Sequence, residues 1–185
     1  MHSALTVGPR RAGRLLVPAG AGAVAAVAVG VFGARHHPGK LSYDLGFSSL
    51  FAMKVWLAVG VGVLALLQLL SALWMFRRLP LGRPPRWIGA AHRATGTLAF
   101  LVSLPVAYAC LYVLGFQHSS ARVLAHSLLG CLFYGAFVTK VLTLHTSRLP
   151  RWALPVVGGV LFTVVIALVL TSAAYTLATE GSPGY

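Results

Sequence analysis

Hydrophobic and polar positions alternate along the chain in long blocks, with five apolar runs separated by short polar or proline-containing connections. The runs cover residues 15–34, about 49–76, 88–116, 122–144 and 152–176. An α-helix of ~20 residues, at ~1.5 Å per residue, matches the ~30 Å hydrocarbon core of a bilayer. The pattern therefore predicts an all-α integral membrane protein, a bundle of five transmembrane helices.

The polar connections divide the predicted fold into parts. Residues 1–14 form a leader, residues 35–48 form a loop on the opposite side of the membrane, and residues 179–185 form a short tail. Residues 49–178 are expected to form a four-helix transmembrane domain, to which the first apolar run adds an N-terminal span.

Small residues recur at four-residue spacing in the first apolar run: Gly22, Ala26, Gly30 and Ala34. Such a stripe lets another helix approach closely, so we expect the first helix to pack against the four-helix domain. A cleaved signal peptide is the alternative interpretation, and it would leave four spans. That interpretation requires an unusually long apolar region and places Phe32 where cleavage sites carry a small residue.

Three residues inside the later runs place constraints on the helices. Pro105 lies within the third run and is expected to kink it, because its ring and missing N–H disturb the helical hydrogen bonds. Lys54 lies near one end of the second run, where its ammonium can reach the membrane interface. Gln68 lies deeper in the same run, so its amide is expected to hydrogen-bond to another helix.

Composition supports the membrane assignment and limits the chemistry. The chain is 58% hydrophobic and 9% charged, whereas a soluble domain carries about a quarter charged residues. The net charge of +13 comes from short basic clusters between apolar runs. Such clusters predict binding to the anionic cytoplasmic leaflet and to membrane protein partners, and no binding to nucleic acid. Asp44 and Glu180 are the only acidic residues, which disfavours carboxylate-based catalysis and proton-coupled transport.

Arginine and lysine are distributed unevenly between the two sides of the predicted bundle. One side carries eleven of them: Arg10, Arg11, Arg14, Arg77, Arg78, Arg83, Arg86, Arg93, Lys140, Arg148 and Arg151. The other side carries four: Arg35, Lys40, Lys54 and Arg122. Because cytoplasmic loops are enriched in these residues, the bias predicts a multi-pass protein of the plasma or bacterial inner membrane with its N-terminus cytoplasmic and its C-terminus outside.

A short motif occurs twice, once in each of the third and fourth runs. His92 to Phe100 and His126 to Tyr134 both read H-x-x-x-G-x-L-x-[F/Y], with the histidine near the start of an apolar segment. Consecutive spans are antiparallel, so the two histidines should lie near opposite faces of the membrane. Ionisable residues within a membrane are candidates for function.

The histidines are candidate axial ligands of haem b. His92 and His145 are expected at the same level near the cytoplasmic face, and two imidazoles from facing helices are what a haem iron requires. His126 is a candidate ligand near the outer face, but the third run offers no histidine at its depth. The sequence therefore predicts an inner pair and an outer ligand without a partner.

Other residues near these histidines could serve the same site. Gly96 and Gly130 follow their histidines by one turn and leave room for a flat macrocycle or another helix. Arg93 and Lys140 lie near the inner pair and could bind haem propionates. This set describes a transmembrane electron-transfer protein with haem b as its cofactor.

The alternative hypothesis requires no cofactor. A histidine in an H-x-x-x-G motif can hydrogen-bond across two helices while the glycine allows them to approach. The chain would then be a non-catalytic accessory or scaffold subunit of the membrane. A transporter is disfavoured because no acidic residue lies within a span and only Pro105 breaks one near its middle.

Three segments resemble a family of small bacterial multi-pass membrane proteins with no assigned function. They are KVWLAVGVGVLALLQLLSALWMFRRLP, HRATGTLAFLVSLPVAYACLYVLGFQ and RVLAHSLLGCLFYGAFVTKVL. The resemblance extends over residues 48 to about 176, so that the first span lies outside it. More distantly, the helices that carry His92 and His126 are similar to those of membrane cytochromes b and ferric reductases, a similarity that implies haem binding.

Overall fold

The computed structural model describes residues 13–37, 39 and 44–184. Three of the residues in the charge count lie outside the described residues: Arg10, Arg11 and Lys40. The long helices and their short extensions are, in chain order, η1 (Gly13–Leu15), α2 (Leu16–Arg35), α3 (Leu50–Met75), α4 (Ile88–Tyr108), a π-helical segment (Ala109–Leu114), α5 (Ala121–His145), α6 (Ala153–Val169), a second π-helical segment (Leu170–Ala174) and α7 (Tyr175–Thr179).

Serine side chains define the starts of two of the long helices. The Ser49 side chain accepts a hydrogen bond from the Ala52 backbone N–H at the start of α3, and Ser120 accepts one from Val123 at the start of α5. Each serine satisfies an N–H group that has no partner within the first helical turn. These caps fix where α3 and α5 begin after their polar loops.

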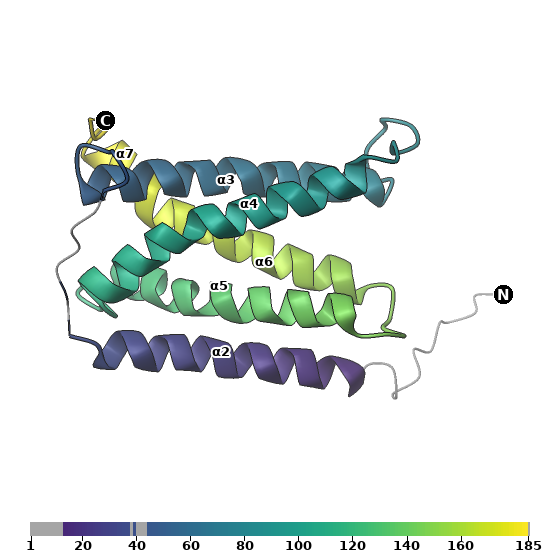
Figure 1. Ribbon diagram of the computed structural model, residues 1–185, viewed down its shortest axis with the longest axis horizontal. Coiled ribbons are helices and arrows are strands. Elements are labelled where there is room, and N and C mark those ends of the chain that lie inside the picture. The colour runs from purple at the N-terminus through teal and green to yellow at the C-terminus, as the bar shows by residue number, and fades with distance from the viewer. Residues whose placement is uncertain (1–12, 38, 40–43, 185) are drawn as a thin grey trace.

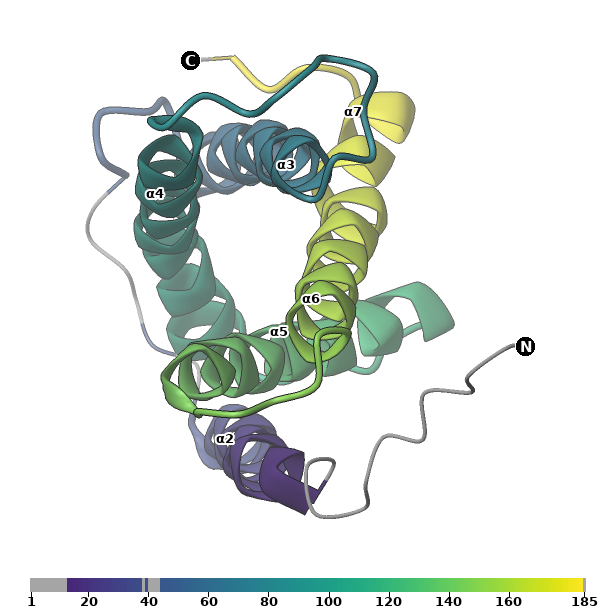
Figure 2. The same cartoon turned by 90° about the vertical axis from the view of Figure 1, so that its right-hand side faces the viewer.

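Four helices, α3 to α6, surround a central axis, and α2 packs on the outside of α5 (Figure 1, Figure 2). One end of the bundle carries α7 and the starts of α3 and α5, and we call it the α7 end. The opposite end carries the α3–α4 and α5–α6 connections, and we call it the basic-loop end. The arrangement is a four-helix core with an additional N-terminal helix, as the sequence predicts.

The small residues of α2 lie against α5. A Cβ atom added to Gly22 would overlap Thr139 Oγ1 and the Gly135 carbonyl, and one added to Gly135 would lie 2.6 Å from Gly22 O. Gly30 faces Cys131 on the same helix, with its added Cβ 3.4 Å from Sγ. The prediction that the small-residue stripe packs against another helix is therefore confirmed, and α5 is that helix.

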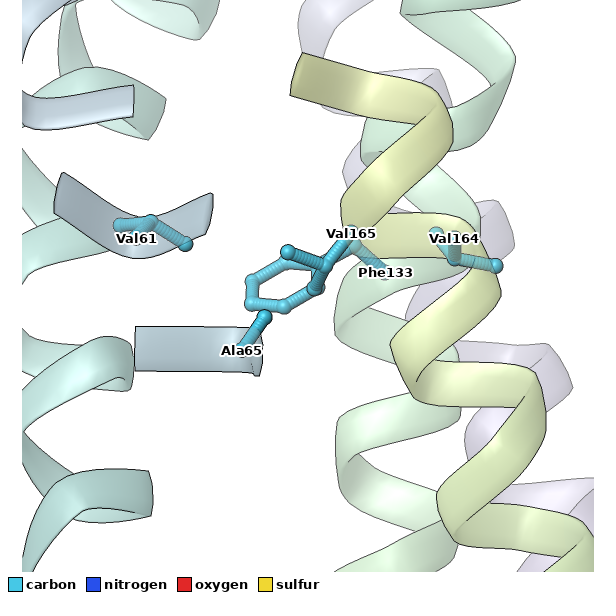
Figure 3. Close-up of a cluster of buried hydrophobic side chains, with 5 residues drawn as sticks. All are labelled: Val61, Ala65, Phe133, Val164 and Val165. Atoms are coloured by element: carbon cyan, nitrogen blue, oxygen red, sulfur yellow. The ribbon is translucent and has the colours of Figure 1, made fainter. Parts of the chain in front are cut away.

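A cluster of buried apolar side chains lies between α3, α5 and α6. Figure 3 shows its members: Val61, Ala65, Phe133, Val164 and Val165. Large apolar side chains elsewhere are exposed, Leu104 on α4 and Leu128 on α5 among them. Five helical stretches are long and apolar enough to cross a membrane by length and composition, and their exposed apolar faces are those of a multi-pass membrane protein.

Pro105 lies inside α4, which continues to Tyr108. The backbone becomes π-helical directly afterwards, at Ala109–Leu114, and a second π-helical segment at Leu170–Ala174 joins α6 to α7. Segments of this kind add a residue to a helical turn and often occur beside functional sites. Both lie towards the α7 end, where they line a cavity described below.

Candidate functional site

The first repeat histidine, His92, joins α4 to α3. Its Nδ1 lies 2.7 Å from Ser71 Oγ, and the ring is half-buried. Ser71 also donates to Leu67 O on its own helix at 2.7 Å. With the serine proton placed there, the assigned tautomer has His92 donating through Nδ1–H, and its Nε2 keeps a lone pair.

Gln68 adds a second polar connection between the same two helices. Its Nε2 donates to the His92 carbonyl and to Thr95 Oγ1, the latter at 2.6 Å. A Cβ atom added to Gly96 would lie 3.0 Å from Gln68 Oε1. Gly96 thus provides space for the amide of Gln68, and the prediction that Gln68 hydrogen-bonds to another helix is confirmed.

His145, the predicted partner of His92, is exposed near the end of α5. Its Nδ1 lies 2.9 Å from the Val141 carbonyl one turn earlier on the same helix. Helices α4 and α5 meet instead through aromatic rings, with Phe100 and Phe137 stacked at a centroid distance of 4.1 Å. The hydrogen bonds therefore direct the two histidines to different elements, His92 to α3 and His145 to its own helix.

Two cations lie near His92 at this end of the bundle. Lys140 on α5 is half-buried, and Arg93, the residue after His92, has an exposed side chain. Both are close enough to interact electrostatically with the His92 imidazole. Both cations therefore act on the imidazole of His92. Within the described residues, no group of three or more His, Cys, Asp or Glu side chains is arranged to hold a metal ion.

The second repeat histidine, His126, joins α5 to the π-helical segment after α6. Its Nδ1 lies 3.1 Å from Thr171 Oγ1, and Thr171 donates to Ala167 O at 2.8 Å. The local arrangement thus matches that of His92, with an imidazole directed at a hydroxyl group of the other helix of its hairpin. Gly130, one turn later, differs from Gly96, because a Cβ added there meets no atom within 4 Å.

A Cβ added to Gly130 meets no atom because Gly130 lines a partly open cavity of about 360 Å³ between α3, α4, α5 and α6. The cavity extends from the α7 end to the buried cluster of Figure 3, since Val61, Phe133 and Val165 belong to both. Its lining is mainly apolar, and the polar groups towards the α7 end are Lys54, Gln117, Arg122, His126, Ser127, Thr171, Ser172, Thr176 and Glu180.

Sequence reasoning placed Lys54 at the membrane interface and counted Arg122 among the basic residues of the outer side, and it assigned neither to a site. Both line the cavity, and both interact electrostatically with His126. The signal available in the sequence was a cation near the start of a helix, at about the depth expected for His126. Its significance depends on which way each helix faces.

His36 is the C-cap residue of α2. It is half-buried, with its ring stacked on Phe32 at a centroid distance of 5.2 Å and tilted against Tyr112 at 4.2 Å. Its Nε2 is buried and has no hydrogen-bond partner among the described residues. The residue packs α2 against the π-helical segment that follows α4, and His36 does not line the cavity of His126.

The donor set does not fit a bis-histidine haem. His126 is the one histidine among the described residues that line the cavity, and neither His92 nor His145 does so. An iron in this cavity would have one imidazole ligand from the chain. A membrane cytochrome b of the bis-histidine type requires two.

Comparison with known proteins places the chain in a family. No curated protein and no solved structure matches it. A family model described as a family of unknown function, DUF6529, matches residues 15–184. The match includes the first span, which corrects the expectation that the family begins near residue 48. The match covers nearly the whole described chain, with all five long helices, and the protein belongs to the DUF6529 family.

Proposed function

We propose that the chain is a non-catalytic accessory or scaffold subunit of the bacterial inner membrane, with its N-terminus cytoplasmic. One observation carries the proposal: each repeat histidine directs Nδ1 to a hydroxyl group of the neighbouring helix, His92 to Ser71 and His126 to Thr171. The repeated motif then serves the same structural purpose in both hairpins, and it needs no cofactor.

The physical basis is the absence of water in the membrane interior. A polar side chain there is stabilised by a partner on another helix, and each such hydrogen bond contributes ~0.6 kcal/mol on average. The bonds of His92 and His126 lie at opposite ends of the bundle and hold α3–α4 and α5–α6 in fixed registers. A bundle held in this way presents rigid apolar faces to lipid and to a partner protein.

A b-haem electron-transfer protein is the second candidate function, and one observation favours it. His126 lines a cavity, and donation from its Nδ1 to Thr171 leaves Nε2 for a metal, the arrangement in which metal-bound histidines are usually held. Here His126 would be the ligand from the described residues, because neither His92 nor His145 lines the cavity and His145 is exposed against its own helix.

The visible spectrum of protein purified from cells supplied with a haem precursor separates the two functions. The scaffold proposal expects no Soret band in the wild-type protein. A Soret band that sharpens on dithionite reduction and disappears in His126→Ala would establish haem binding and overturn the proposal. His118→Ala is the matched control, because His118 is exposed and does not line the cavity.

The partner is tested by cross-linking in intact membranes before solubilisation. A scaffold subunit is expected to cross-link to the same protein at a fixed ratio in the wild type and in His126→Gln, which retains a hydrogen-bonding side chain. Recovery of the chain without any stoichiometric partner, in membranes and after mild solubilisation, would contradict the scaffold role.

A further inference from the structure

We propose that the cavity at the α7 end binds a single-tailed amphiphile with an anionic headgroup, a carboxylate or a phosphate monoester, whose headgroup lies among Lys54, Arg122 and His126. This inference concerns a binding site and goes beyond the scaffold function. It depends on the position of the charges, on the apolar walls and on the volume of the cavity.

Positive charge converges on the α7 end of the cavity from two helices. Lys54 projects from α3 and Arg122 from α5, and both interact electrostatically with His126. Arg122 Nη1 donates to Thr171 O at 2.7 Å, and its guanidinium lies 3.9 Å from the centre of the Tyr175 ring. The guanidinium is thereby held against the cavity, with further N–H donors available to an anion.

The described carboxylates do not neutralise these charges. The chain has two acidic residues, of which Glu180 lines the cavity and Asp44 does not. Within the described residues, neither carboxylate forms an ion pair with Lys54 or Arg122, and Asp44 Oδ1 instead accepts from the Gly46 backbone N–H. The α7 end of the cavity therefore keeps an excess of positive charge that an anionic headgroup would balance.

The remainder of the cavity is suited to an apolar tail. Its walls include Val55 and Ala58 of α3, Val106 of α4 and Leu168 of α6, and its floor is the cluster of Figure 3. Arg122 at the α7 end of the cavity and Phe133 in the buried cluster are both on α5. They lie about 16 Å apart along the helix axis, at a rise of ~1.5 Å per residue.

The volume of the cavity argues for one tail. The cavity is partly open and mainly apolar, and its volume of about 360 Å³ offers room for an apolar chain. The volume lies near the lower end of the ~300–1,000 Å³ range of small-molecule sites, which favours one chain over the two of a phospholipid. Within a bilayer, single-tailed lipids are the available molecules with this shape and charge.

The experiment measures binding of tritiated dodecanoate to the full chain in phosphatidylcholine nanodiscs, with binding to empty nanodiscs subtracted. Unlabelled dodecanoate, dodecyl phosphate and dodecanol serve as competitors. We expect saturable binding, and we expect dodecanol to compete about tenfold less well than one of the two anions, because it lacks the charge that Lys54 and Arg122 would contact. The better anion identifies the headgroup.

Two variants test the two halves of the site. Gly130→Leu directs a side chain into the cavity without a clash at Cβ and is expected to abolish binding. Its control is Gly158→Leu, since a Cβ there also meets no atom within 4 Å and Gly158 does not line the cavity. Lys54→Gln with Arg122→Gln is expected to lower affinity about tenfold, whereas Arg83→Gln with Arg86→Gln should leave it unchanged.

Three results would overturn the proposal: no saturable binding above empty nanodiscs, equal competition by dodecanol and both anions, or full binding in Gly130→Leu. If Gly130→Leu does not yield a folded protein, the Lys54 and Arg122 pair decides, because unchanged affinity in that double variant excludes the headgroup site. The scaffold function is judged separately by its cross-linked partner, so either proposal can fail while the other stands.

Discussion

The imidazole Nδ1 of His92 and the hydroxyl oxygen of Ser71 lie 2.7 Å apart, and their hydrogen bond joins α4 to α3 at the basic-loop end of the bundle. The contact lies between consecutive helices of one hairpin. His126 and Thr171 form the corresponding contact in the next hairpin, at the α7 end. The pair of contacts gives the repeated motif a structural meaning that is open to measurement.

The first prediction concerns the energy of the His92–Ser71 contact. In a double-mutant cycle of His92→Ala and Ser71→Ala, we expect a coupling of ~0.6 kcal/mol, and no more than ~1.7 kcal/mol, in the free energy of unfolding. The measurement is denaturation by dodecyl sulfate in bicelles. Pairing His92→Ala with Ser119→Ala provides the control, since Ser119 lies in an exposed loop. A zero coupling for His92 and Ser71 would show that the contact contributes nothing to stability.

The second prediction separates the two glycines of the repeat. Gly96→Ala is expected to destabilise the bundle, because its Cβ would lie 3.0 Å from Gln68 Oε1, and the loss should be smaller in a Gln68→Ala background. Gly130→Ala is expected to be neutral or to stabilise by up to about 1 kcal/mol, because its Cβ meets open space and alanine favours the helix. Equal destabilisation by both changes would contradict the different roles assigned here.

The sequence predicted the helices of this fold well because helix length and apolar composition are set locally. Residues 88–116 were expected to be helical and are so from Ile88 to Leu114, and the stripe that includes Gly22 correctly indicated a close helix contact. These properties need no knowledge of the neighbouring element.

The site was less predictable because it depends on the direction each helix faces. Adjacent positions on a helix differ by about 100° around its axis, so depth alone did not show that His145 faces its own backbone and His92 faces Ser71. The cavity is a property of four helices together, and Lys54 and Arg122 acquire their meaning from it. Position along the chain gives depth, whereas tertiary packing gives the partner.

The third prediction concerns orientation in the membrane. In a background with both native cysteines replaced by serine, we introduce Ser119→Cys at the α7 end and Ser147→Cys at the basic-loop end, both at exposed positions. The excess of arginine and lysine at the basic-loop end predicts that a membrane-impermeant maleimide labels Ser119→Cys in intact spheroplasts. Ser147→Cys should react only after the membrane is opened. The reverse pattern would show that the C-terminus is cytoplasmic.

The last prediction uses the close contact between α2 and α5. A Cβ added at Gly30 lies 3.4 Å from Cys131 Sγ, so Gly30→Cys should form a disulfide with Cys131 on mild oxidation, in a background where Cys110 is replaced by serine. Thiol labelling followed by mass measurement reports the yield.

Gly22→Leu should suppress that disulfide, because Gly22 lies against the Gly135 backbone two turns away and any larger side chain forces the helices apart. Gly20→Leu is the matched control, since a Cβ at Gly20 meets no atom within 4 Å, and its disulfide yield should be unchanged. A high yield in Gly22→Leu would mean that α2 stays on α5 without the glycine contact. The small-residue stripe would then not be what attaches the first span to the four-helix core.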